Sequence, residues 1–79
     1  MEIKILGSGC ANCENLEKAT RMAVDKLGIE ARVTKVGEIV DIISYGVVRT
    51  PGLVINEKLV HYGGMLSVEE IKRLILENE

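Results

Sequence analysis

The sequence predicts a small α/β fold with the element order βαβαββα, in which helices cover both faces of a mixed four-stranded sheet. Two observations support this prediction. A strand-like, a helix-like and a second strand-like segment open the chain, and such a unit forms a parallel pair with a right-handed crossover. Nearer the C-terminus, two short strand-like segments flank a polar turn, and this hairpin adds antiparallel strands to the same sheet.

Length and composition fit one domain over residues 1–79. A chain of 79 residues has room for one core and one site, and 47% hydrophobic with 28% charged residues is typical of a folded, soluble protein. The net charge of −2 comes without a basic cluster, so nothing supports nucleic-acid binding. No apolar run could span a bilayer, and the opening residues do not resemble a signal peptide. We expect a cytoplasmic monomer with no membrane partner.

The first strand is expected at Glu2–Leu6, where β-branched Ile3 and Ile5 alternate with other residues. A helix follows over Cys10–Leu27, and Gly28 supplies its left-handed cap. One apolar stripe recurs along this helix at three- and four-residue steps: Cys13, Leu16, Thr20, Ala23, Val24 and Leu27.

A second strand is expected at Ile29–Val36, ended by Gly37. The next segment, Glu38–Tyr45, has a helical period and stops at Gly46. Three isoleucines should form one face of this helix, Ile39, Ile42 and Ile43.

The dipeptide Thr50-Pro51 excludes helix, because the residue before a proline is pushed out of helical space. Strands at Gly52–Ile55 and Leu59–Tyr62 then flank a turn. The last helix starts at a capping box, in which Ser67 and Glu70 satisfy each other's backbone N–H groups. Its buried stripe contains Val68, Ile71, Leu74 and Ile75.

Both cysteines lie between the first strand and the first helix, as Cys10-Ala11-Asn12-Cys13. A Cys-x-x-Cys at this place can cycle between dithiol and disulfide, because the first helical turn holds the two sulfurs near bonding distance. The helix N-terminus favours a thiolate, and such sites lower the thiol pKa from about 8.5. We therefore expect Cys10 to be the nucleophile and Cys13, on the apolar stripe, to be the shielded resolving thiol.

The cysteine pair combines with a second motif further along the chain. The segment Tyr45–Ile55 contains Thr50-Pro51 before an apolar strand, and a hairpin and Gly63-Gly64 follow it. This pattern resembles the thioredoxin superfamily, and most of all its small redox-active disulfide members, which share a compact layout with glutaredoxins. The resemblance implies a thioredoxin-like fold, a cis bond before Pro51 and no cofactor beyond the redox-active cysteine pair. It also implies a thioredoxin-reductase-type electron donor and disulfide-containing target proteins.

The resemblance further implies a surface that binds targets around the cysteines. An extended target strand would pair with the backbone of Thr50, beside the cis bond. Gly63-Gly64 either lets a target backbone approach closely or serves as a connector. The residues assigned to target binding are Gly9, Ala11, Asn12, Arg49, Thr50, Pro51, Gly63 and Gly64.

Three alternatives stay open. Two thiolates suit a soft ion, so the chain could be a Cu(I) or Zn carrier, although such carriers run βαββαβ. The cysteines and distant His61, expected as an ordinary surface residue, do not reach the four ligands of structural zinc, so no metal site is assigned. A glutaredoxin-like, glutathione-dependent reductase would usually have a tyrosine within the cysteine motif. A thioredoxin-fold binding module without turnover is the third.

Overall fold

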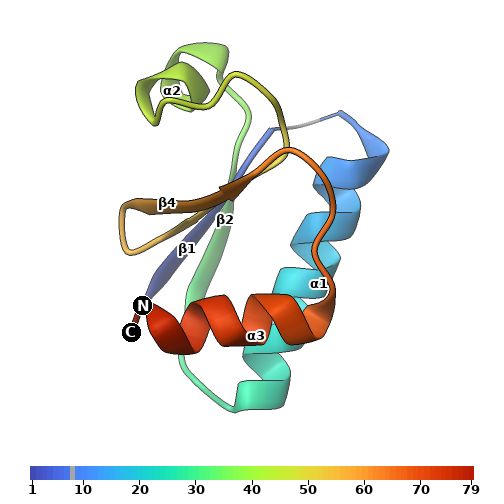
Figure 1. The fold of residues 1–79 in the computed structure, drawn as a ribbon, viewed down its shortest axis with the longest axis vertical. Coiled ribbons are helices and arrows are strands. Elements are labelled where there is room, and N and C mark those ends of the chain that lie inside the picture. Colours follow the sequence, from blue (N-terminus) through green and yellow to red (C-terminus); the bar gives the residue numbers. More distant parts are fainter. Residues whose placement is uncertain (8) are drawn as a thin grey trace.

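The computed structural model describes residues 1–7 and 9–79, and it has the predicted order of elements (Figure 1). The sheet order is β2-β1-β3-β4, with β1 parallel to β2 and the other pairs antiparallel. The predicted βαβαββα fold with a mixed four-stranded sheet is therefore confirmed. The elements are β1 (Glu2–Leu6), α1 (Ala11–Leu27), β2 (Arg32–Val36), α2 (Ile39–Ser44), β3 (Gly52–Ile55), β4 (Lys58–Tyr62) and α3 (Val68–Glu77).

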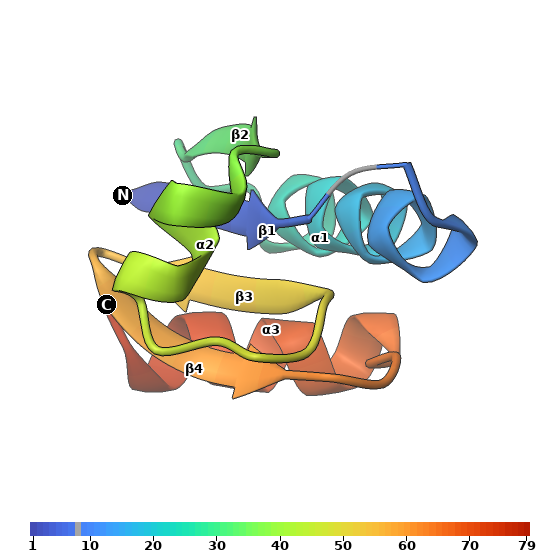
Figure 2. The ribbon, with the colours of Figure 1, turned by 90° about the horizontal axis from the view of Figure 1, so that it is seen from above.

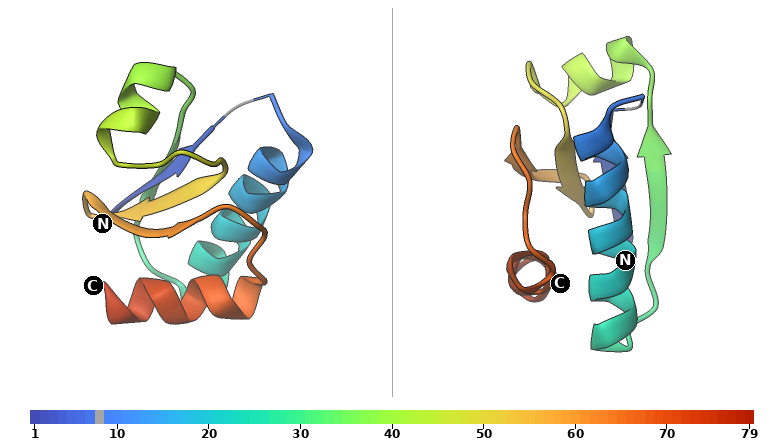
Figure 3. Two further views of the ribbon diagram at one scale, coloured as in Figure 1. Left: turned by 45° about the horizontal axis from the view of Figure 1, so that its top comes forward. Right: turned by 90° about the vertical axis from the view of Figure 1, so that its right-hand side faces the viewer.

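Helices α1 and α3 pack on one face of the sheet and α2 on the other, as the left view of Figure 3 shows. All four residues of β3 are buried, because this inner strand is covered on both faces. The larger core lies under α1 and α3, and its fully buried members are Ile3, Ile5, Leu16, Ala23, Leu53, Ile55, Ile71 and Ile75.

A smaller apolar cluster lies under α2, and its buried members are Leu6, Ile42, Val47 and Val54. Of the three isoleucines that were predicted to form one face of α2, only Ile42 is buried. Ile42 is only 7% exposed, but Ile39 is 70% and Ile43 61% exposed. The helix has six residues and is therefore about 9 Å long, so it contacts the sheet mainly through one side chain.

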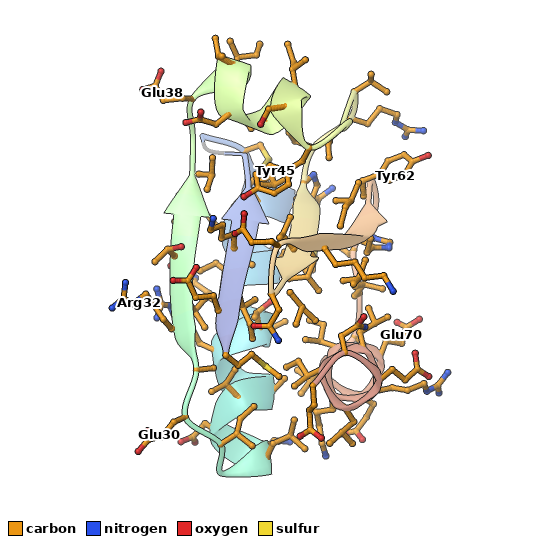
Figure 4. The ribbon with its side chains drawn as sticks, turned by 90° about the vertical axis from the view of Figure 1, so that its left-hand side faces the viewer. Glu30, Arg32, Glu38, Tyr45, Tyr62 and Glu70 are labelled. Atoms are coloured by element: carbon orange, nitrogen blue, oxygen red, sulfur yellow. A yellow bond between two sulfur atoms is a disulfide. The ribbon has the colours of Figure 1, made fainter. Side chains whose placement is uncertain are left out.

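The part of this face that α2 leaves open is covered by a polar cluster of Lys4, Tyr45 and Glu57. The Nζ atom of Lys4 donates to the Tyr45 hydroxyl at 2.9 Å and to the Glu57 carboxylate, and the hydroxyl donates to Glu57 at 3.1 Å. Figure 4 shows Tyr45 below α2 and in front of β1. The hydrogen bond to Glu57 raises the pKa of Lys4 above its ordinary value, and the same bond lowers the pKa of Glu57.

Local signals set the ends of the two longer helices. Gly28 caps α1 with a left-handed φ of 66°, as predicted. The predicted capping box opens α3, because Glu70 N–H donates to Ser67 Oγ at 3.1 Å and Ser67 N–H donates to Glu70 at 2.9 Å. Strand β2 begins at Arg32, later than the predicted Ile29. None of the helices in the described part of the chain has the length and apolar content needed to cross a membrane.

Candidate active site

Three loops meet at one end of the sheet because of the strand directions (Figure 2). Strands β1 and β4 end there and β3 begins there, since Leu6 pairs with Gly52 and Gly52 pairs with Tyr62. The loop between β1 and α1, the loop that precedes β3 and the loop that follows β4 therefore share this edge. Both cysteines and the Thr50-Pro51 dipeptide belong to these loops or to the helix turn that follows them.

Cys10 and Cys13 form a disulfide across the first turn of α1, with their Cα atoms 5.2 Å apart. Cys10 is the N-cap of the helix, with extended backbone angles, and Cys13 lies three residues further along. The backbone N–H of Cys13 donates to the Sγ atom of Cys10 at 3.1 Å. The positive end of the helix and one of its unpaired N–H groups are therefore directed at the Cys10 sulfur.

The two cysteines differ in accessibility. Cys13 is fully buried, whereas Cys10 is partly exposed. This difference follows from their positions, because the N-cap lies at the rim of the loop and the next turn faces the sheet. A reagent that approaches from solvent therefore meets the sulfur of Cys10 first.

Gly7, at the end of β1, lies between the cysteine pair and the loop before β3. A Cβ atom on Gly7 would lie 2.8 Å from Cys13 Sγ and 3.0 Å from Thr50 Cβ, and the φ angle of Gly7 is 121°. Only a residue without a side chain allows this close approach. We did not predict that Gly7 lies close to both partners.

The peptide bond between Thr50 and Pro51 is cis. Thr50 is exposed and Pro51 is buried, so the proline anchors the loop while the threonine faces solvent beside the cysteines. The backbone N–H of Gly63 donates to the carbonyl oxygen of Pro51 at 2.8 Å, which ties the third loop to the second. The structure thus brings Cys13, Thr50, Pro51 and Gly63 together.

Comparisons with known proteins agree with this geometry. A family model described as Thioredoxin domain matches residues 1–76. The chain belongs to the thioredoxin domain family. It is 44% identical over 75 residues to a protein named Thioredoxin from Methanothermobacter thermautotrophicus strain Delta H, covering 95% of this chain and 97% of the relative. It is 39% identical over 70 residues to one of the same name from Methanocaldococcus jannaschii, covering 89% and 80%.

The predicted family is therefore confirmed, and the chain is a thioredoxin-like thiol–disulfide oxidoreductase with Cys10 and Cys13 as its redox-active disulfide. The remaining predicted residues lie around this pair. Gly9, Ala11 and Asn12 are exposed beside Cys10. Arg49 is exposed, and its Cζ atom lies 4.0 Å from the place of a Cβ on Gly63. Gly63 is buried and Gly64 is exposed.

This thioredoxin-like domain also has an apolar groove beside the site, which we did not predict. The groove has a volume of about 490 Å³ and reaches from Gly7 and Thr50 to α2. Its apolar lining residues are Ile39, Ile42, Ile43, Val47 and Val48. Val48 is 88% exposed, and Ile39 and Ile43, which were predicted only to share a helix face, are exposed as well.

His61 is not the ordinary surface residue that we predicted. It is partly buried in β4, and its Nε2 atom lies 2.9 Å from the carbonyl oxygen of Gly63 and 3.2 Å from that of Gly64. Within residues 1–7 and 9–79, no group of three or more histidine, cysteine, aspartate or glutamate side chains is placed to hold a metal ion. The cysteine pair by itself offers two soft ligands, fewer than the four of a structural zinc site.

Proposed function

We propose that this protein reduces disulfides in target proteins, with Cys10 as the attacking thiol and Cys13 as the resolving thiol. The thiolate of Cys10 attacks one target sulfur, forms a mixed disulfide and releases the other target sulfur as a thiolate, which takes a proton from water. The thiolate of Cys13 then attacks Cys10 Sγ and releases the second target sulfur. Two electrons pass to the target, and the Cys10–Cys13 disulfide forms.

The observation that carries this order of events is the difference in exposure between the two cysteines. Cys10 is partly exposed and Cys13 fully buried, so only Cys10 can meet a sulfur of another protein. The hydrogen bond from Cys13 N–H to Cys10 Sγ supports the same assignment, because a donor at 3.1 Å and the positive helix end favour a thiolate there. Cys13 is then in place to resolve the mixed disulfide.

We propose that targets bind as an extended segment along the loop before β3. Thr50 is an exposed residue close to Gly7 and Cys13, and an extended segment can add to its backbone by main-chain hydrogen bonds. Gly9, Ala11 and Asn12 border this segment on the side of Cys10, and Arg49 and the loop of Gly63 and Gly64 border it on the other. An apolar side chain of the target would enter the groove between Thr50 and Ile43.

The oxidised protein needs a source of electrons to act again, and we propose a donor of the thioredoxin-reductase type. The two archaeal relatives, each named Thioredoxin, support this choice. We further propose that the protein acts as a single-domain monomer in the cytoplasm, where thiols are kept reduced. No cofactor beyond the cysteine pair is required for the two exchange steps.

Insulin reduction with dithiothreitol as donor tests this function. Wild type should accelerate the reaction, Cys10→Ser should abolish the acceleration, and Cys13→Ser should prevent turnover while leaving a first exchange. Equal rates in the presence of all three proteins would overturn the proposal. Tight binding of one equivalent of Cu(I) by the reduced protein, with no disulfide formed on mild oxidation, would instead favour a soft-metal carrier. Activity only with glutathione as donor would favour a glutaredoxin-like reductase.

A further inference from the structure

We infer that His61 is a positioning residue that holds the loop of Gly63 and Gly64 in the shape that receives target proteins; this inference rests on the proposed function. The Nε2 atom lies within hydrogen-bonding distance of two successive carbonyl oxygens, at 2.9 Å and 3.2 Å. Carbonyl oxygens only accept, so Nε2 must carry a proton. In the neutral ring, Nδ1 is then unprotonated.

The segment that His61 contacts consists of two glycines, which have more backbone freedom than other residues. Gly63 and Gly64 have φ angles of 74° and 33°, and two consecutive glycines lose more backbone freedom on ordering than other residues. When one N–H of His61 is shared by the two carbonyl oxygens, both oxygens face the same ring. This sharing fixes the orientation of the two peptide units for as long as the ring donates.

This orientation determines which backbone groups face a target. In a trans peptide the N–H points away from the C=O of the same unit, and the only cis bond in the described residues precedes Pro51. The N–H groups of Gly64 and Met65 therefore point away from His61, and both residues are exposed. Across the part of the chain that the structure describes, no hydrogen bond from either amide is found. A target backbone could accept from them.

The loop of Gly63 and Gly64 is linked to the cysteine pair through a hydrogen bond and the residues that adjoin it. Gly63 is buried, and its N–H donates to the Pro51 carbonyl at 2.8 Å, while Thr50 and Cys13 both lie beside the place of a Cβ on Gly7. Among the described residues, no hydrogen bond joins His61 to either cysteine. We therefore expect His61 to affect the binding of the target and not the thiol–disulfide exchange step.

Two substitutions distinguish the effect of the His61 N–H donor from the effect of its ring. His61→Phe keeps a ring in the partly buried space but removes the N–H, and His61→Gln restores a donor at a similar reach. Lys58→Ala, an exposed change on the same strand, serves as the control. Each protein is first reduced, and its single-turnover reaction is followed with insulin and with bis(2-hydroxyethyl) disulfide, a substrate too small to contact the loop.

For His61→Phe, the insulin concentration that gives half of the maximal rate should rise roughly two- to tenfold, the loss expected for one hydrogen bond. The maximal rate and the reaction with the small disulfide should change less than twofold, and His61→Gln should recover most of the loss. The inference is overturned if His61→Phe matches wild type with insulin, if it slows both substrates equally, or if glutamine gives no recovery. A wild type that reduces neither substrate defeats the proposed function itself.

A spectroscopic readout tests the same contact in the wild-type protein, without any substitution. A two-bond ¹H–¹⁵N spectrum at pH 8 reports which ring nitrogen is protonated. We expect the Nε2–H tautomer. Finding the Nδ1–H tautomer would overturn the inference, because Nε2 could not then donate to the two carbonyls.

Discussion

Cys13 and Thr50 both lie so close to Gly7 that a side chain at this position would have no room. A Cβ there would lie 2.8 Å from the Cys13 sulfur and 3.0 Å from Thr50 Cβ. The end of β1 is thus the place where the cysteine pair comes close to the loop that precedes β3.

Gly7→Ala should destabilise the oxidised protein by about 1–3 kcal/mol, because the new methyl overlaps a buried sulfur and the φ of 121° is unfavourable for alanine. Urea unfolding measures this change. Gly9→Ala is the matched control, since Gly9 has a φ of 72° but no atom within 4 Å of an added Cβ. Equal losses for the two variants would show that the contact with Cys13 and Thr50 has no energetic weight.

Ile42→Ala should lower the free energy of unfolding by about 2–4 kcal/mol, the usual effect of truncating a buried isoleucine. Ile39→Ala, on the same helix, should change it by less than about 1 kcal/mol, because that side chain is 70% exposed and Ile42 only 7%. Chemical denaturation of both variants tests whether α2 packs on the sheet mainly through Ile42. Similar losses for the two would contradict this packing.

Ile43→Glu should weaken the reaction with insulin several-fold by placing a charge in the apolar groove, while the rate with a small disulfide stays the same. Its effect on stability should be small because Ile43 is 61% exposed. Val40→Glu is the control, since Val40 is 74% exposed on the same helix and does not line the groove. If both glutamates act alike, general charge repulsion explains the effect and the groove does not.

Acid should weaken the cluster of Lys4, Tyr45 and Glu57. The hydrogen bond from Lys4 holds the pKa of Glu57 below its ordinary value. The contribution of this pair to the free energy of unfolding is therefore complete above the unfolded pKa of about 4.3, and it is lost as the pH falls through the folded pKa. The melting temperature of wild type should therefore fall more steeply below about pH 4.3 than that of Glu57→Gln. Glu30→Gln, outside the cluster, should follow wild type. Melting temperatures that fall equally steeply in acid for wild type and Glu57→Gln would contradict this account.

Much of the fold could be predicted because its signals are local. The stripe from Cys13 to Leu27, the cap at Gly28 and the box of Ser67 and Glu70 each require only a few neighbouring residues. The cysteine pair was found for the same reason. A family resemblance was enough to direct attention to Thr50 and Pro51.

The features that could not be predicted depend on contacts between segments that are distant in the sequence. Gly7 matters because Cys13 and Thr50 meet there, and the sequence does not show how closely the first and third strands bring them. The exposure of Ile39 and Ile43 could not be predicted, because the helical period gives a face but not the area of sheet available to cover it. The approach of His61 to the carbonyl oxygens of Gly63 and Gly64 depends on the pairing of β3 with β4, whose register shifts between Leu53 and Val54.

The most direct test of the central claim, that Cys10 attacks and Cys13 resolves, is to trap the intermediate. Reduced Cys13→Ser is mixed with oxidised insulin, and the products are mapped by mass spectrometry without reductant. The account predicts a mixed disulfide between Cys10 and an insulin cysteine, and no comparable adduct with Cys10→Ser. An adduct that forms equally well through Cys13 in Cys10→Ser would contradict it.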